Sequence, residues 1–426
     1  MLGDKKVNRC YLKRALLALS GCFLAAALTV SAGQQERDQA KRMHDRLIGS
    51  APSQAMLLAM ETEIMNNDLV AAALLAINGN GSVTANPAFY NVVLKNWASP
   101  WTNEEQDPFV ALNDYSAMVI GLIREDADFR EILYGDRFFV PVIAGTESYS
   151  ATDNNSYEQL EADGADLSDD DVLRQINPAS TVLSIDSAGI AGIFSTRAAA
   201  KAFYKDGTNR AMLRFTLVNH LCMDLEDLKD GTRFADRIRQ DVTRSPGGDS
   251  RIFLNNCLEC HSGMDPMAQA FAYYDYSYPD NNPDGGNVVY SPGVVHPKYL
   301  INENNFLQGY VTTNDTWTNY WVSGSSAEKV GWLSNISSAF DPSGNNKFPS
   351  AAGAKTLGME LADTDAFAAC QIRKAFQPTC LRDPLPTEFS AFFDPNNASS
   401  LLTQFKSNGN MKNVFAELAA HCANEL

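Results

Sequence analysis

The stretch Phe253–Pro266, FLNNCLECHSGMDP, contains two cysteines followed directly by a histidine. Cys257, Cys260 and His261 form the pattern C-x-x-C-H, to which haem c is covalently attached. Two thiols one helical turn apart can form thioethers with the two vinyl groups of a porphyrin, and the adjacent imidazole then lies beneath the ring as the proximal iron ligand. The pattern predicts one covalent haem c, anchored by Cys257 and Cys260 and ligated by His261.

Two other roles for the same cysteines fit the sequence less well. A structural zinc site needs two more ligands nearby, and the chain has no second C-x-x-C and no histidine pair. A thioredoxin-like dithiol needs a strand-to-helix setting, which the flanking residues do not offer. Haem attachment is therefore the interpretation that we carry forward.

The N-terminus predicts export. Five basic residues precede an apolar run from Ala15 to Val30, and small residues lead to Ser31-Ala32 and a polar continuation. This order is typical of a secretory signal peptide cleaved after Ala32, and it predicts a periplasmic protein. An uncleaved anchor and a lipoprotein modified at Cys22 are the alternatives. The apolar residues that continue after Cys22 disfavour the second, because a polar tether normally follows a lipidated cysteine.

The composition is acidic. The formal net charge is −17, and residues 1–32 carry five basic and one acidic residue, so their removal changes −17 to −21. Nucleic acids and anionic membranes attract a positive protein surface, so both are disfavoured as partners. The charge instead favours a redox protein with a basic docking surface.

Cleavage of the signal and use of the motif leave four cysteines: Cys222, Cys370, Cys380 and Cys422. An even number in an oxidising compartment predicts two disulfides, with three ways of pairing them. A bridge between Cys370 and Cys380 across a helix–turn segment would leave Cys222 to pair with Cys422. The other two pairings stay open at this point.

The apolar spacing is mostly helical, so we predict a mainly α fold. The mature chain is long enough for two domains, which we place at residues 33–180, an N-terminal helical domain, and 181–426, a helical haem domain. A region rich in Asn, Asp, Gly and Pro at 276–350 predicts a loop-rich insertion. Within it, Asn287–Tyr290 and Phe306–Thr312 are the strand candidates.

An acidic segment, DLSDDD at residues 166–171, resembles a calcium loop superficially. It lacks the alternating ligands and the glycine of an EF-hand. Ser168 followed by Asp171 predicts instead a helix N-cap with acidic residues in the first turn.

The second axial ligand has several candidates. His296 lies on a downstream loop that can fold over the haem, and Met359 is the methionine alternative. His220, among apolar residues of a predicted helix, is a further candidate, although such a histidine is more often structural. Met264 and Met267 are too close to His261 to reach the opposite haem face, so we expect them to pack.

Three segments resemble the cytochrome-c-like domains of unknown function first described in planctomycetes. The segment around the motif reads NNCLECHSGMDPMAQAFAYYDY, the upstream one AGIFSTRAAAKAFYKDGTNRAMLRF, and the downstream one TLGMELADTDAFAACQIRKAFQPTCLRDP. The resemblance covers about half of the chain and implies covalent haem c in a mainly helical, cytochrome-c-like domain. The Cys370 and Cys380 pair, the 276–350 region and the acidic insertion depart from that family.

Together these observations predict an exported mono-haem c-type cytochrome acting in periplasmic electron transfer. The alternative is a haem c enzyme, a peroxidase- or oxidase-like subunit, with an open distal site. The size of the chain favours this alternative, since an electron carrier needs only about 100 residues. The single C-x-x-C-H disfavours it, because di-haem peroxidases need two. A structural haem in an envelope-assembly protein is the third alternative.

Overall fold

The computed structural model describes most of the chain after the predicted export signal, namely residues 33–176, 183, 185–332, 338–340 and 347–424. The signal itself, residues 1–32, lies outside the described residues. Helices hold 54% of the residues and strands 8%, so the predicted mainly α class is confirmed. The chain divides into two compact units. Unit 1 combines the described residues up to Asn86 with those from Phe415 on, and unit 2 is Pro87–Val414. The predicted boundary near residue 180 falls inside unit 2.

Unit 1 is helical. Its elements are a helix over residues 33–48, α2 (Gln54–Met65), α3 (Leu69–Asn78) and most of α17 (Met411–Ala423). Ser53 and Asp68 begin α2 and α3 by accepting backbone N–H groups at 3.1 and 2.8 Å. Gln39 donates to the Asn424 side chain at 2.8 Å, which joins the two ends of the described chain within this unit. The three helices before Asn86 agree with the mostly helical apolar spacing of the sequence.

The first part of unit 2 packs helices against a small antiparallel sheet. Its helical elements are η1 (Phe89–Leu94), α4 (Lys95–Ala98), η2 (Ser99–Thr102), α5 (Asp114–Arg124), η3 (Phe129–Ile132) and α6 (Asn155–Ala162). The sheet has the order β2 (Thr146–Glu147), β1 (Phe138–Ile143), β3 (Leu173–Ile176). Gly121 lets α5 lie on β1, because a Cβ there would come within 2.3 Å of the Phe139 ring.

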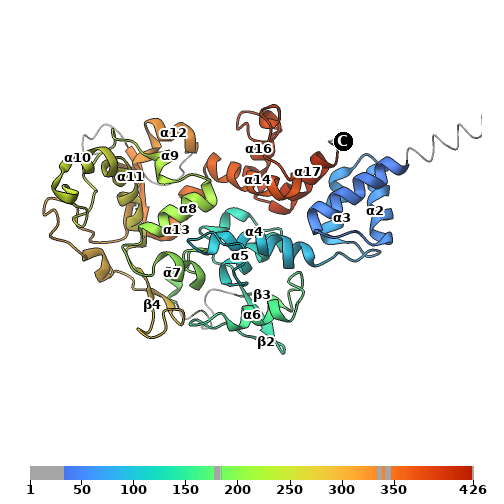
Figure 1. Cartoon of the computed structure of the whole chain (residues 1–426), viewed down its shortest axis with the longest axis horizontal. Helices are drawn as coiled ribbons and strands as arrows, with labels where there is room; N and C mark the ends of the chain where they lie inside the picture. The colour runs from blue at the N-terminus through green and yellow to red at the C-terminus, as the bar shows by residue number, and fades with distance from the viewer. Residues whose placement is uncertain (1–32, 177–182, 184, 333–337, 341–346, 425–426) are drawn as a thin grey trace, which may run out of the picture. The chain divides into compact units, whose positions relative to one another are not determined.

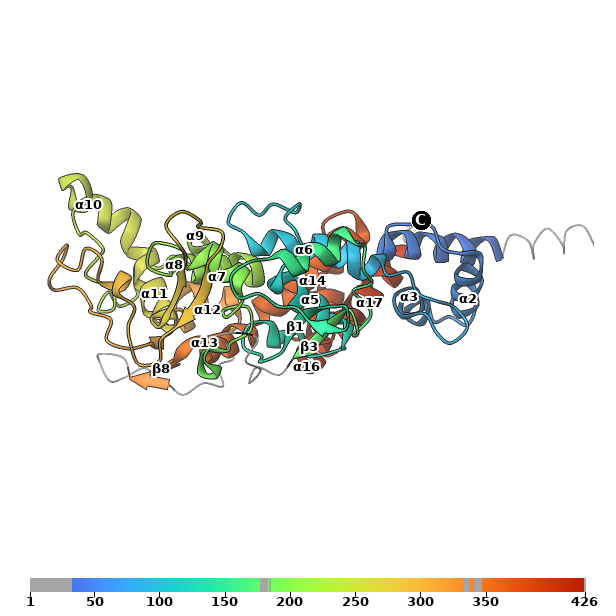
Figure 2. The ribbon, with the colours of Figure 1, turned by 90° about the horizontal axis from the view of Figure 1, so that it is seen from below.

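The middle of unit 2 contains the C-x-x-C-H motif. Its helical elements before and through the motif are η5 (Ser187–Gly189), α7 (Arg197–Phe203), α8 (Arg210–Thr216), η6 (Leu217–Leu221), α9 (Leu225–Leu228), η7 (Pro246–Gly248), α10 (Ser250–Ile252), η8 (Phe253–Cys257), α11 (Leu258–Ala268) and η9 (Gln269–Phe271). Figures 1 and 2 show α10 leading through η8 into α11 as one helical run. α11 packs against α8, α9 and the strand β6 (Thr316–Thr318).

The predicted loop-rich region holds more structure than expected. It contains most of the hairpin of β4 (Tyr274–Ser277) and β5 (Asn287–Tyr290), then η10 (Pro297–Leu300), η11 (Tyr320–Val322), α12 (Ser325–Val330) and a sheet of order β6 (Thr316–Thr318), β8 (Lys347–Ala352), β7 (Ser338–Phe340). The strand predicted at Asn287–Tyr290 is confirmed. The one predicted at Phe306–Thr312 is wrong. The Gly309 N–H turns back to the Phe306 carbonyl at 2.8 Å, so that only Tyr310 forms a bridge, with Arg239.

The C-terminal part of unit 2 is helical again, as expected. It comprises α13 (Gly353–Ala362), α14 (Asp365–Cys380), η12 (Pro386–Glu388), α15 (Phe389–Phe392), α16 (Leu401–Asn408) and the start of α17. Thr364 caps α14 by accepting the Phe367 N–H at 3.0 Å. Among the described residues, no helix has the length and apolarity needed to cross a membrane.

Of the three pairings that the sequence left open, the one that joins Cys370 to Cys380 is not formed, because the structure joins Cys222 to Cys370 with a Cα–Cα distance of 5.3 Å. Both Cys370 and Cys380 lie in α14, ten residues apart. A helix rises about 1.5 Å per residue, so their Cα atoms are roughly 15 Å apart, beyond the about 7 Å that a disulfide spans. Cys380 and Cys422 are disulfide-bonded as well. The prediction that all four remaining cysteines form disulfides is therefore confirmed.

Candidate functional site

The motif occupies the point where a π-helical turn becomes an α-helix. Cys257 is the last residue of η8, and Cys260 and His261 lie in the first turn of α11. Both thiols are free and half-buried. The Cys260 thiol donates to the Leu225 carbonyl at 3.8 Å. Burial, with Glu226 nearby, raises its pKa. The two cysteines that the motif requires are thus outside any disulfide and partly exposed.

A buried carboxylate orients His261. Its Nδ1–H donates to Asp265 Oδ1 at 3.0 Å, one helical turn along α11. Asp265 is fully buried and also accepts from Arg210 Nε at 2.7 Å and from the Arg239 backbone N–H at 3.1 Å. Burial alone would raise the pKa of Asp265, but Arg210 and His261 outweigh it and hold the pKa far below its usual range. Nε2 of His261 is therefore the nitrogen left for another ligand.

The segment before the motif wraps along α11 and holds it in place. The Asp230 N–H donates to the Glu259 carbonyl at 3.2 Å, and the Ser262 hydroxyl donates to the Asp230 carbonyl at 3.4 Å. On another side Gly263 lies against Trp321, where a Cβ would come within 2.0 Å of the indole ring. The motif helix is therefore fixed on several sides by residues far from it in sequence.

One side of the motif helix carries apolar residues that the protein leaves uncovered. Leu254 is 54% exposed, and Leu258 is half-buried. Leu254 and Leu258 are four residues apart, and His261 follows three residues later, which is helical spacing for one face. A porphyrin joined to Cys257 and ligated by His261 would cover such a face. The residues present therefore fit a covalently attached haem.

The predicted distal candidates are placed as follows. His296 Nε2 lies 2.8 Å from Asp275 Oδ2, and its Nδ1 accepts the Lys298 N–H at 3.4 Å, so both ring nitrogens have partners. Met359 lies on α13 and is 40% exposed. Neither residue has a contact that brings it to His261, and both stay predictions. Met264 and Met267 are buried in α11, as expected of packing residues.

His220 lies in an aromatic cage. It is fully buried, its Nε2 is 2.6 Å from the Tyr115 hydroxyl, and Trp101 and Phe367 pack around its ring. Burial, helped by Lys374, lowers the pKa of His220 well below its usual value. These contacts favour the structural role over that of a haem ligand.

The sequence interpretation missed Asp265 and Arg210. The i, i+4 spacing of His261 and Asp265 is a local signal that could have identified the carboxylate. Nothing local indicates Arg210, because it comes from α8, 55 residues earlier.

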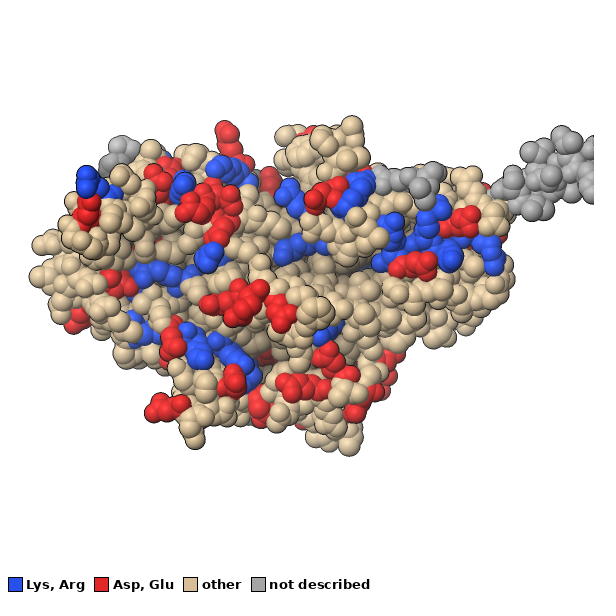
Figure 3. All heavy atoms as spheres, in the orientation of Figure 1, with Lys and Arg blue, Asp and Glu red and all other residues tan. Residues whose placement is uncertain are grey.

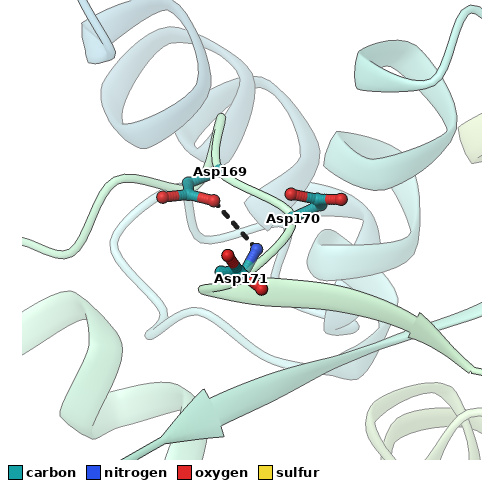
Figure 4. A group of neighbouring side chains, drawn as sticks. All are labelled: Asp169, Asp170 and Asp171. Carbon is teal, nitrogen blue, oxygen red and sulfur yellow. Dashed lines mark hydrogen bonds between the residues drawn. The ribbon is translucent and has the colours of Figure 1, made fainter. Parts of the chain in front are cut away.

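The acidic segment forms a turn and not the predicted helix start. Figure 4 shows Asp169, Asp170 and Asp171 close together, and their carboxylate oxygens lie within 4.8 Å of one another. Asp169 accepts the Asp171 N–H at 2.9 Å, and the chain then enters β3. The helix predicted after Ser168 is therefore wrong, because the Asp169 side chain closes a turn that leads into a strand. All three side chains are exposed, and we assign no ion to them.

Surface charge is mixed on one face of the molecule. Figure 3 shows acidic and basic side chains interleaved on the face drawn. Close to the motif, Arg251 pairs with Asp249 and Arg237 lies beside Asp236. Acidic and basic side chains are therefore both present near the motif.

Comparisons with protein-family models, curated proteins and solved structures produced no match to this chain.

Proposed function

We propose that this chain is an exported mono-haem c-type cytochrome that transfers electrons in the periplasm. The observation that carries the proposal is the geometry at the motif: two free, half-buried thiols three residues apart, followed by a histidine whose Nδ1 is already held by a buried carboxylate. The remaining predicted features, export and a redox partner with a basic docking surface, belong to the same proposal.

Each residue has a distinct role. Cys257 and Cys260 supply the sulfurs for the two thioether bonds, and His261 supplies Nε2 to the iron. Asp265 keeps the proton on Nδ1 and fixes the plane of the imidazole, and Arg210 fixes Asp265. When bound, haem supplies the one-electron chemistry, and the protein sets the potential through the axial ligand, burial and hydrogen bonds.

The cysteine chemistry supports the compartment. Disulfides persist in oxidising compartments, and Cys222, Cys370, Cys380 and Cys422 are all disulfide-bonded. The thiols of Cys257 and Cys260 stay apart from this pairing, which leaves them available for haem.

The proposal is tested by producing the chain in a periplasm that assembles c-type cytochromes and measuring haem that survives denaturing electrophoresis. We expect one covalent haem per chain in the wild type and none in Cys257→Ala, Cys260→Ala. Glu259→Gln changes a residue between the cysteines without removing a sulfur, and it should retain the haem. A wild type without covalent haem, or a double variant that keeps it, contradicts the proposal.

The second candidate, a haem c enzyme with an open distal site, is favoured by one observation. His296, the first distal candidate, already uses both ring nitrogens within the protein. The ferrous spectrum with and without carbon monoxide separates the two functions. A six-coordinate spectrum that does not change supports electron transfer, and carbon monoxide binding supports the enzyme.

A further inference from the structure

A groove of about 780 Å³ lies in unit 2, and no residue of the C-x-x-C-H motif is among its lining residues. It is bordered by the end of η6, by α12 and α14, and by the segment around α15. Its lining includes both cysteines of the Cys222–Cys370 disulfide, together with the apolar side chains Leu385, Phe389 and Phe393. A disulfide and an apolar wall therefore face the same hollow.

The two cysteines differ in exposure. Cys222 is half-buried, whereas Cys370 is only 1% exposed. A nucleophile in the groove consequently reaches the Cys222 sulfur more easily, and Cys370 is the leaving group. The Cys370 sulfur lies 3.9 Å from the Asn219 carbonyl oxygen, which can accept the S–H bond once the thiol forms.

The backbone at Cys222 is also unusual. Its φ is 54° and ψ is 35°, a left-handed conformation that a residue with a Cβ adopts at a cost. Cys222 is the residue that follows the π-helical turn η6. Such turns are uncommon in proteins, and those that occur are often found at functional sites. Cleavage of the disulfide would free this residue to leave the left-handed region.

The groove wall carries exposed apolar side chains where a partner can reach them. Leu385 is 50% exposed and Phe389 is 55% exposed, and both line the groove. Apolar groups beside a reactive bond offer a recognition surface for an extended apolar segment.

From these observations we propose that the Cys222–Cys370 disulfide is a thiol–disulfide exchange site. The groove takes an apolar segment of a dithiol redox protein and aligns its thiolate with Cys222. This inference does not depend on haem binding.

The exchange is balanced in two steps. The partner's first thiolate attacks the Cys222 sulfur, the Cys222–Cys370 bond breaks, and its electron pair leaves on the Cys370 sulfur, which takes up a proton from solvent. The partner's second thiolate then attacks the mixed disulfide and releases Cys222 as a thiolate. The partner dithiol is oxidised by two electrons, and the disulfide of this chain is reduced by two.

The first test compares the disulfides of the folded wild-type chain. The chain is treated with dithiothreitol, the new thiols are alkylated, and the peptides are identified by mass spectrometry. We expect Cys222 and Cys370 to become labelled at least ten times faster than Cys380 and Cys422. Equal rates, or labelling only when the protein unfolds by circular dichroism, overturn the proposal.

The second test examines the groove. A synthetic peptide with one cysteine among leucine and phenylalanine residues is compared with glutathione as the attacking thiol. Leu385→Asp, Phe389→Asp should slow exchange with the peptide at least tenfold and change the rate with glutathione less than twofold. Leu381→Asp is the control, because Leu381 is 70% exposed and does not line the groove. An unchanged peptide rate in the double variant shows that the groove does not recognise the thiol and overturns that part of the proposal.

Discussion

At the scale of single residues, Asp265 is the most consequential side chain near the motif. It is fully buried, yet it is charged, because Arg210 and His261 hold its pKa far below the usual range. A buried charge is tolerated when each of its oxygens is hydrogen-bonded, and here both carboxylate oxygens are used. The same bonds that stabilise the charge orient the imidazole.

Asp265→Asn should lower the free energy of unfolding at neutral pH by about 3 kcal/mol. This value is at the lower end of the cost of breaking a buried ion pair. The reason is that Arg210 would still be paired with Asp241, at 2.8 Å, in the variant. Since the pKa of Asp265 is lowered on folding, its contribution is complete above the ordinary value of 3.8 and is lost as the pH falls below that value. Denaturant unfolding between pH 7 and pH 3 should show the wild type losing its advantage over the variant. A constant difference across that range would contradict this account.

At the scale of elements, α11 depends on contacts that its own sequence does not reveal. The helix is half-buried at the motif and fully buried from Ser262 to Ala268. Gly263 is the point of closest approach, since the Trp321 indole occupies the space of a Cβ. The glycine is needed there for space, not for an unusual backbone angle.

Gly263→Ala provides the test at this scale. In a free helix this change would stabilise by up to about 1 kcal/mol, but here we expect a loss of about 1–3 kcal/mol because the methyl group collides with Trp321. Gly81→Ala is the control, since a Cβ at Gly81 meets nothing within 4 Å, and it should change stability by less than about 0.5 kcal/mol. Thermal unfolding of the wild type and the two variants shows whether Gly263→Ala raises or lowers the stability. A Gly263→Ala variant as stable as the wild type would show that Trp321 moves freely.

At the scale of the whole molecule, long-range links hold unit 2 together. The Cys222–Cys370 disulfide joins residues 148 positions apart and connects η6 to α14. Beside it, Gln371 donates to the His220 carbonyl at 3.0 Å, and Asn219 donates to the Trp101 carbonyl at 3.1 Å. The segment around His220 is thus tied to two distant parts of the chain, η2 and α14.

Replacing both cysteines, Cys222→Ala with Cys370→Ala, should lower the free energy of unfolding by about 2–5 kcal/mol. Most of the loss arises because the unfolded chain regains the freedom of a long loop. The measurement is urea unfolding of the haem-free chain, with Cys257→Ala as a control that removes a cysteine but no disulfide. A double variant as stable as this control would show that the link does not constrain the unfolded state.

Sequence patterns predicted local features well and long-range ones poorly. The mainly α class and the strand at Asn287–Tyr290 follow from periodicity, and both are confirmed. The helix predicted after Ser168 and the strand predicted at Phe306–Thr312 are wrong. In the first case a side-chain hydrogen bond closes a turn, and in the second a backbone hydrogen bond does so, and each turn replaces the predicted element. Cys370 and Cys380 are close in sequence, but a helix holds them apart.

The sequence by itself determined the spacing of Cys257, Cys260 and His261, because a helix places residues three and four apart on one side whatever surrounds it. It also determined that four other cysteines remain to pair. Only the tertiary structure decided that Cys222 pairs with Cys370, that Arg210 holds Asp265, and that both cysteines of the disulfide line a groove with apolar side chains on its wall. These contacts join segments tens of residues apart, and local periodicity carries no information about which distant segments pack together.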